Sequence, residues 1–159
     1  MRSRCGFTLV ELVIVLSLLA ATGLLVALNW PSPLGPASSA LRNFVSQARL
    51  EAVARNEPIA VVFDAVTGQY QQRHALDGSY RPAELCGSGQ VLRSLDLSDY
   101  RGVTLGPGGS GLIWLPTGYG RTCLGGGAFN QTIRLMHRGL EARIFVSRAG
   151  RVRSEVELR

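Results

Sequence analysis

The first 25 residues of the chain read MRSRCGFTLVELVIVLSLLAATGLL, and this stretch decides how the fold begins. From Phe7 to Trp30 the only charged side chain is that of Glu11. At about 1.5 Å of rise per residue, a helix of this length would cross the roughly 30 Å hydrocarbon layer of a bilayer. A carboxylate at the centre of a bilayer costs about 2.5–3.5 kcal/mol or more, so the sequence predicts that Glu11 has a compensating partner.

A secretory signal peptide is the alternative interpretation of this stretch. Arg2 and Arg4 would form its positive start, and Ala20 and Ala21 are small residues near a possible cleavage point. The apolar run is longer than the usual signal core, and it contains an acid. Both features favour a retained membrane helix, with the short basic N-terminus in the cytoplasm and everything after about Trp30 outside the inner face of the membrane.

The segment Cys5-Gly6-Phe7-Thr8-Leu9-Val10-Glu11-Leu12 resembles the class III signal of type IV pilins and type II secretion pseudopilins. The resemblance implies that residues 1–6 are a leader, removed between Gly6 and Phe7 by a prepilin peptidase, and that Phe7 becomes N-methylated. It also implies that Glu11, the fifth mature residue, meets the terminal amine of a neighbouring subunit, because a charge pair in low dielectric is favoured over a lone charge. The implied partners are other pilins or pseudopilins, the peptidase and the inner-membrane assembly platform.

Beyond the apolar segment, the sequence predicts an α+β fold. Pro31, Pro33 and Pro36 should break or kink the helix. Ser38 or Ser39 should cap a second helix, which Pro58 closes. The expected organisation is a membrane and assembly helix over 7–30, a proline linker and second helical half over 31–57, and a β-rich head over 58–159. The second helical half is expected to pack on the antiparallel sheet of this β-rich part, whose strands are expected over 59–65, 69–74, 91–97, 103–105, 112–115, 132–136, 142–147 and 152–156.

The C-terminal half is similar to the GspH/FimT group of minor pilins and pseudopilins. The resemblance rests on the segments 113–118, 132–135, 142–147 and 150–153, together with 49–55 before the first strand. It does not extend to the middle of the chain, roughly 77–111. The helix in this family is one long rod, and the proline cluster departs from that pattern.

Three cysteines require an account. If Cys5 leaves with the leader, Cys86 and Cys123 remain as a pair in a domain outside the cytoplasm, where disulfides persist. A disulfide between them is therefore predicted, and two separate buried thiols are the alternative. No metal site is expected, because His74 and His137 lack ligand spacing. Neither a cofactor nor an enzymatic activity is expected, since the sequence carries no catalytic signature.

Charge is concentrated at the C-terminal end. Arginine supplies all 17 basic residues against 11 acidic ones, for a net charge of +6. From Arg121 onward there are eight arginines and three acids. Arg148, Arg151 and Arg153 flank a glycine turn, and with Arg143 they are candidate contacts for successive DNA phosphates, a mode of binding that salt weakens.

Two alternative functional hypotheses follow from these observations. The first is a minor pilin that assembles into or primes a type IV pilus and, as the FimT side of the resemblance implies, binds double-stranded DNA during natural transformation. The second is a GspH-type minor pseudopilin of type II secretion with a purely structural role. In both, the head is expected in the periplasm.

Overall fold

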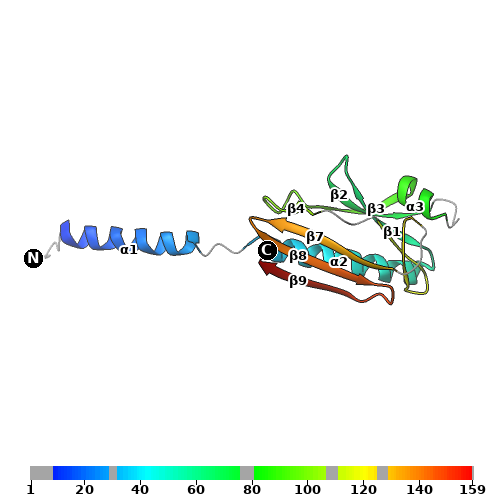
Figure 1. Ribbon diagram of the computed structural model, residues 1–159. Helices are drawn as coiled ribbons and strands as arrows, with labels where there is room; N and C mark the ends of the chain where they lie inside the picture. The colour runs from blue at the N-terminus through cyan, green and yellow to red at the C-terminus, as the bar shows by residue number, and fades with distance from the viewer. Residues whose placement is uncertain (1–8, 29–31, 76–80, 107–110, 125–128, 159) are drawn as a thin grey trace, which may run out of the picture. The chain divides into compact units, whose positions relative to one another are not determined.

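The computed structural model describes residues 9–28, 32–75, 81–106, 111–124 and 129–158 (Figure 1). The chain divides into two compact units, Met1–Ser32 and Pro33–Arg159, and each is described by itself. We call the second unit the head. Gly6 and Phe7, the predicted cleavage and methylation residues, lie outside the described residues.

The first unit contains helix α1, Leu9–Leu28. Glu11 lies in its first turn, where the positive end of the helix dipole favours an acid. Two polar side chains inside the apolar sequence donate to carbonyls of the preceding turn, Ser17 Oγ to Val13 O and Thr22 Oγ1 to Leu18 O, both at 2.9 Å. The predicted helix is thus confirmed over these residues. Among the described residues, however, no helix is both long and apolar enough to cross a membrane, and the predicted span is not confirmed.

The head begins with helix α2, Leu34–Arg55, which starts directly after Pro33. The predicted cap was wrong: Ser38 is buried inside the helix, and its Oγ donates to Gly35 O at 2.9 Å. Pro36 explains the earlier start, because the first helical turn needs no internal N–H bonds and tolerates proline. The helix ends before Pro58, as predicted, through a left-handed Asn56 whose N–H bonds to the last turn.

Nine strands form two antiparallel sheets in the described part of the head. The five-stranded sheet has the order β3-β2-β1-β5-β6, and the four-stranded sheet has the order β4-β7-β8-β9. The strands are β1 Ile59–Asp64, β2 Gln69–His74, β3 Gln90–Asp96, β4 Thr104–Leu105, β5 Leu112–Trp114, β6 Gly120–Thr122, β7 Asn130–His137, β8 Leu140–Ser147 and β9 Val152–Leu158. The sequence predicted eight of them within a few residues and missed β6, as well as the short helix α3, Pro82–Ser88.

Helix α2 supplies the centre of the core, in contact with both sheets. Its buried side chains pack with residues of β1, β5, β7 and β8 in one cluster. Two side chains of the five-stranded sheet also donate to carbonyls of α2: Trp114 Nε1 to Val45 O at 3.0 Å, and Gln72 Nε2 to Phe44 O at 2.9 Å. Because both donors are fully buried, each bond avoids the cost of an unsatisfied polar group. The two bonds also fix the position of α2 against the five-stranded sheet.

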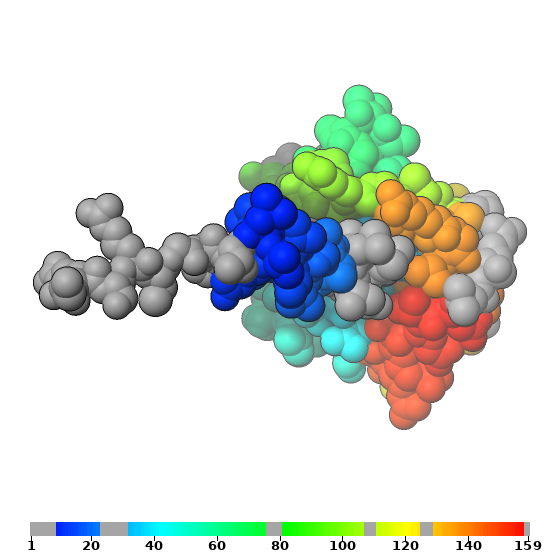
Figure 2. Space-filling view, turned by 90° about the vertical axis from the view of Figure 1, so that its left-hand side faces the viewer, coloured from blue at the N-terminus to red at the C-terminus, as the bar shows by residue number. Residues whose placement is uncertain are grey.

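A disulfide joins Cys86 on α3 to Cys123 after β6, with 5.9 Å between their Cα atoms, and confirms the predicted pairing. Next to it, Leu85 packs with Ala60, Val62 and Ile113 in a second, smaller cluster. The disulfide and this cluster hold α3 against the five-stranded sheet. The edge strands of the four-stranded sheet are β4 and β9. Figure 2 shows β9 in red beside the orange residues of β7 and β8.

Candidate functional site

The predicted arginines lie on or next to the outer face of the four-stranded sheet, the face turned away from α2. Along β8, Ala142, Ile144 and Val146 are buried in the core that contains α2. Side chains alternate along a strand, so Arg143, Phe145 and Ser147 belong to the outer face. The strand register places Arg153 opposite Phe145 and Glu155 opposite Arg143.

Arg143 is engaged with acids and stands apart from the other three arginines. Its Nε donates to Glu141 Oε1 at 2.9 Å, and its second contact is to Glu157 Oε2 at 3.2 Å. Glu141 is only 5% exposed, and its Oε1 also lies 3.6 Å from Arg134 Nε. The hydrogen bond with Glu141, followed by the charges of Glu141 and Glu157, raises the pKa of Arg143 above its usual value. Arg143 therefore serves to neutralise buried acid at this end of the face.

The other three arginines gather at the opposite end of the same hairpin, around the turn that joins β8 to β9. We call Arg148, Arg151 and Arg153 the basic end. All three side chains are exposed, and within the described residues their guanidinium groups make neither a hydrogen bond nor an ion pair. Their charges are thus available to a ligand.

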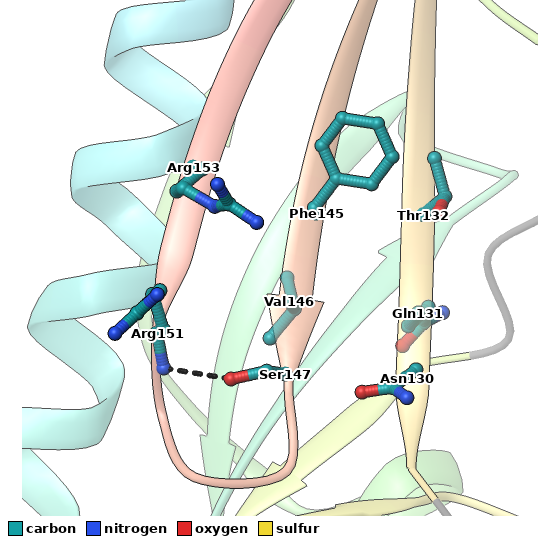
Figure 3. Close-up of a pocket in the computed structure, with 8 residues that line it drawn as sticks. All are labelled: Asn130, Gln131, Thr132, Phe145, Val146, Ser147, Arg151 and Arg153. Atoms are coloured by element: carbon teal, nitrogen blue, oxygen red, sulfur yellow. Dashed lines mark hydrogen bonds between the residues drawn. The ribbon is translucent and has the colours of Figure 1, made fainter.

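The turn that carries the basic end is fixed by its own backbone. Ser147 N donates to Arg151 O and Gly150 N donates to Ser147 O, both at 2.9 Å. The Ser147 hydroxyl accepts from Arg151 N at 3.1 Å, as the dashed line in Figure 3 shows. Gly150 has φ of 84°, a conformation that other residues adopt only with strain. These bonds fix the backbone of the turn between Ser147 and Arg151.

Arg49 of α2 anchors this turn from inside the head, a role that sequence reasoning missed. Its Nε donates to Gly118 O at 3.1 Å and its Nη1 donates to Gly150 O at 3.3 Å. The side chain thereby connects α2 to the β5–β6 turn and to the β8–β9 turn. The Arg49 side chain is half-buried. Nothing local in the sequence indicates contacts across 69 and 101 residues.

A hollow of about 210 Å³ adjoins the basic end on the outer face. It is lined by Asn130, Gln131, Thr132, Phe145, Val146, Ser147, Arg151 and Arg153. Figure 3 shows the Phe145 ring between Arg153 on β9 and Thr132 on β7, with the Arg153 side chain extending toward the ring. The site therefore combines two free cations with one aromatic ring and several neutral hydrogen-bonding groups.

A helical N-terminal segment followed by a helix packed on antiparallel sheets is the architecture of pilin-like proteins. The family model described as type II transport protein GspH matches residues 37–150, and the model of the prokaryotic N-terminal methylation motif matches residues 1–27. The GspH match covers more than half of the chain, and the chain belongs to this family. The methylation motif includes Gly6, Phe7 and Glu11.

Two solved structures share the fold. The minor pseudopilin EpsH of the Vibrio cholerae type 2 secretion system aligns with a TM-score of 0.53 and 13% identity, over 78% of this chain and 97% of that one. The type IV minor pilin FimU of Pseudomonas aeruginosa strain PAO1 aligns with a TM-score of 0.54 and 20% identity, over 77% and 87% of the two chains. No curated protein matches the chain significantly. At these identities the structural likeness shows the fold alone.

Proposed function

We propose that this chain is a minor pilin that is cleaved between Gly6 and Phe7 by a prepilin peptidase, methylated at Phe7, assembled into or priming a type IV pilus, and able to bind DNA through its basic end. Membership in a family of structural pilins and pseudopilins supports a role in assembly, without enzymatic activity. Glu11 contributes to assembly by meeting the terminal amine of a neighbouring subunit. The methylation motif supports the processing steps.

The observation that carries DNA binding is the set of three arginines without acidic partners in the described residues. Arg143 and Arg134, on the same sheet, pair with Glu141, whereas the β8–β9 turn carries three exposed positive charges that no acid neutralises within the described residues. Arginine forks match phosphate oxygens in a bidentate manner. Contacts of this kind recognise the backbone and carry no sequence preference, as expected for a receptor of environmental DNA.

We place the head in the periplasm, with the N-terminal segment holding the chain at the inner membrane before assembly. The Cys86–Cys123 disulfide supports this location, because such bonds persist in oxidising compartments. Fractionation of cells that express the full chain tests the placement. The head should be accessible to protease from the periplasmic side, and protection of the head in spheroplasts would contradict it.

The test of DNA binding compares two triple variants of the full chain in neutral detergent. One carries Arg148→Ala, Arg151→Ala and Arg153→Ala. The other carries Arg42→Ala, Arg93→Ala and Arg101→Ala, which removes the same charge from other elements of the head. Fluorescence anisotropy with a labelled DNA duplex at low salt should show loss of binding in the first variant and near-native binding in the second. If DNA binding weakens equally in both triple variants, binding depends only on net charge, and a defined site at the basic end is contradicted.

The second candidate is a GspH-type minor pseudopilin of type II secretion, in which the basic end contacts neighbouring subunits. The match to the type II transport family model favours it. The two candidates differ in what the basic end should contact. A pseudopilin of this kind should bind no duplex at low salt, while its basic-end variant should be poorly incorporated into the pseudopilus.

A further inference from the structure

The hollow on the outer face carries an aromatic ring that the proposed phosphate contacts do not use. Phe145 is half-buried on β8, although it belongs to the face opposite the core. Its cross-strand neighbours are Arg153 on β9 and Thr132 on β7, as the register and Figure 3 both show. A phenylalanine at a polar sheet surface can offer a π face to a ligand, and Phe145 lines the hollow.

The groups around the ring have the chemistry of a nucleotide site. Arg151 and Arg153 line the hollow with free guanidinium groups, and Asn130, Thr132 and Ser147 add neutral donors and acceptors. None of the described residues that line it is acidic. The hollow has a volume of about 210 Å³, which leaves room for a ligand group beside the ring.

We propose that this hollow binds one unpaired nucleotide of single-stranded DNA, with the base stacked on Phe145 and the flanking phosphates at Arg151 and Arg153. The inference rests on the proposed DNA binding and deepens it. A base inside a duplex has both faces covered by its neighbours and cannot stack on a protein ring. Surfaces that hold single strands combine a basic track with aromatic platforms, and stacking tolerates every base because each has a π face.

The geometry separates the roles of the residues. Arg148 lies on the turn outside the hollow, so it contacts phosphates of either kind of DNA. Phe145 contributes only where a base is free to stack. The structure therefore assigns preference for single strands to one side chain and general affinity to the three arginines.

The test measures binding of the full chain, in neutral detergent, to a labelled oligothymidylate of about 16 nucleotides, near the upper end of single-strand site sizes. The comparison probe is a duplex of the same length. Phe145→Leu keeps an apolar side chain of similar volume but removes the ring, and Phe145→Tyr keeps the ring. Replacing a stacking ring weakens binding by roughly 5- to 150-fold per base.

We expect Phe145→Leu to weaken oligothymidylate binding at least about fivefold, at the lower end of that range, and to leave duplex binding within about twofold. Phe145→Tyr should retain both affinities. In a Phe145→Trp variant, the emission of the new indole should be quenched by the oligonucleotide and not by the duplex. Urea unfolding checks that each variant is folded.

Three outcomes would overturn the proposal. If Phe145→Leu binds oligothymidylate as tightly as the wild type, Phe145 does not stack on a base, although the arginines can still bind a duplex. Equal weakening toward both probes would make Phe145 a support for the surface. Normal DNA binding with poor filament incorporation in Phe145→Leu would assign the hollow to a neighbouring subunit. Absence of binding to both probes in the wild type would instead contradict the proposed DNA function itself.

Discussion

Replacing Arg49 with alanine should destabilise the head, because this side chain joins α2 to two glycine turns. The change removes the hydrogen bonds to Gly118 O at 3.1 Å and Gly150 O at 3.3 Å. A hydrogen bond from a charged group contributes about 1.5–3 kcal/mol, and partial exposure lets water replace part of it. We therefore expect the two bonds together to contribute about 1.5–3 kcal/mol. Arg55→Ala, which removes an exposed pair with Glu51 on the same helix, should cost about 0.5 kcal/mol or less.

The same contact predicts coupling between Arg49 and Gly150. A Cβ added at Gly150 would collide with the Arg49 side chain, and φ of 84° is unfavourable for alanine by about 1–2 kcal/mol. Gly150→Ala alone should therefore suffer from both the strained backbone and the displaced Arg49. In the Arg49→Ala background only the backbone cost of about 1–2 kcal/mol should remain.

Urea unfolding of the four proteins with the disulfide intact measures this coupling. The double variant should be more stable than the sum of the single costs predicts, by about 1.5–3 kcal/mol, the value of the lost Arg49 contact. Costs that add to within about 0.5 kcal/mol would refute the reasoning, since independent sites behave in that way. A cost for Arg49→Ala no greater than that for Arg55→Ala would refute it as well.

Three further predictions concern other parts of the chain. Replacing Cys86 and Cys123 with serine should lower the free energy of unfolding by up to about 4 kcal/mol, the chain-entropy value for a sequence separation of 37, and urea unfolding that matches the oxidised protein would contradict it. The pKa of Asp64 is lowered, mainly by the N–H of Val66, and the pKa of Asp96 is lowered, mainly by the N–H of Ser98. Because both folded values lie below the unfolded ones, the stability they provide is present above about pH 4 and is lost as pH falls through the folded pKa values. The Asp64→Asn and Asp96→Asn double variant should therefore lose less stability than the wild type between about pH 5 and 2; parallel urea midpoints across that range would count against the two N–H bonds. Glu11→Ala should be processed normally but poorly incorporated into filaments, whereas substitution of Gly6 should block processing; immunoblots of membrane and sheared filament fractions measure both, and normal incorporation of Glu11→Ala would contradict the pairing of Glu11 with the terminal amine.

Local signals in the sequence predicted much of the fold. The β1–β2 hairpin is indicated in the sequence by a β-branched run followed by Thr67-Gly68, and Gly68 has φ of 71° as a turn there requires. The terminal hairpin around Gly150 follows the same logic. Helix α2 is indicated in the sequence by apolar residues at three- and four-residue spacing, and all five of them are buried: Leu41, Phe44, Val45, Ala48 and Ala52.

Features that depend on distant partners were beyond the reach of sequence patterns. The short strand β6 owes its existence to pairing with β5 rather than to its own residues, Gly120, Arg121 and Thr122. Helix α3 has only 7 residues, and the disulfide and the buried Leu85 hold it in place. The division into two sheets depends on which strands pair with each other, and the residue pattern within one β-strand does not show its partner.

The candidate site shows the same division. Charge counting directed attention to Arg148, Arg151 and Arg153, and their exposure agrees with that choice. The number of arginines in the sequence does not distinguish Arg143 from these three. Its ion pairs depend on Glu141 and Glu157, which lie on the same sheet face. The alternation of β8 could have indicated Phe145, since an aromatic residue at an outward position is unusual, whereas Arg49 gave no such signal.

The salt dependence of duplex binding by the full chain tests DNA binding by the basic end most directly. If three arginines each neutralise one phosphate, the logarithm of the binding constant should fall with the logarithm of salt concentration with a slope of about −2.7. Removing Arg148, Arg151 or Arg153 singly should reduce that slope by about 0.9 each, while the Arg42→Ala control should leave it unchanged. A slope that stays the same in all three single variants, or the absence of duplex binding at low salt, would contradict a DNA-binding role for the basic end.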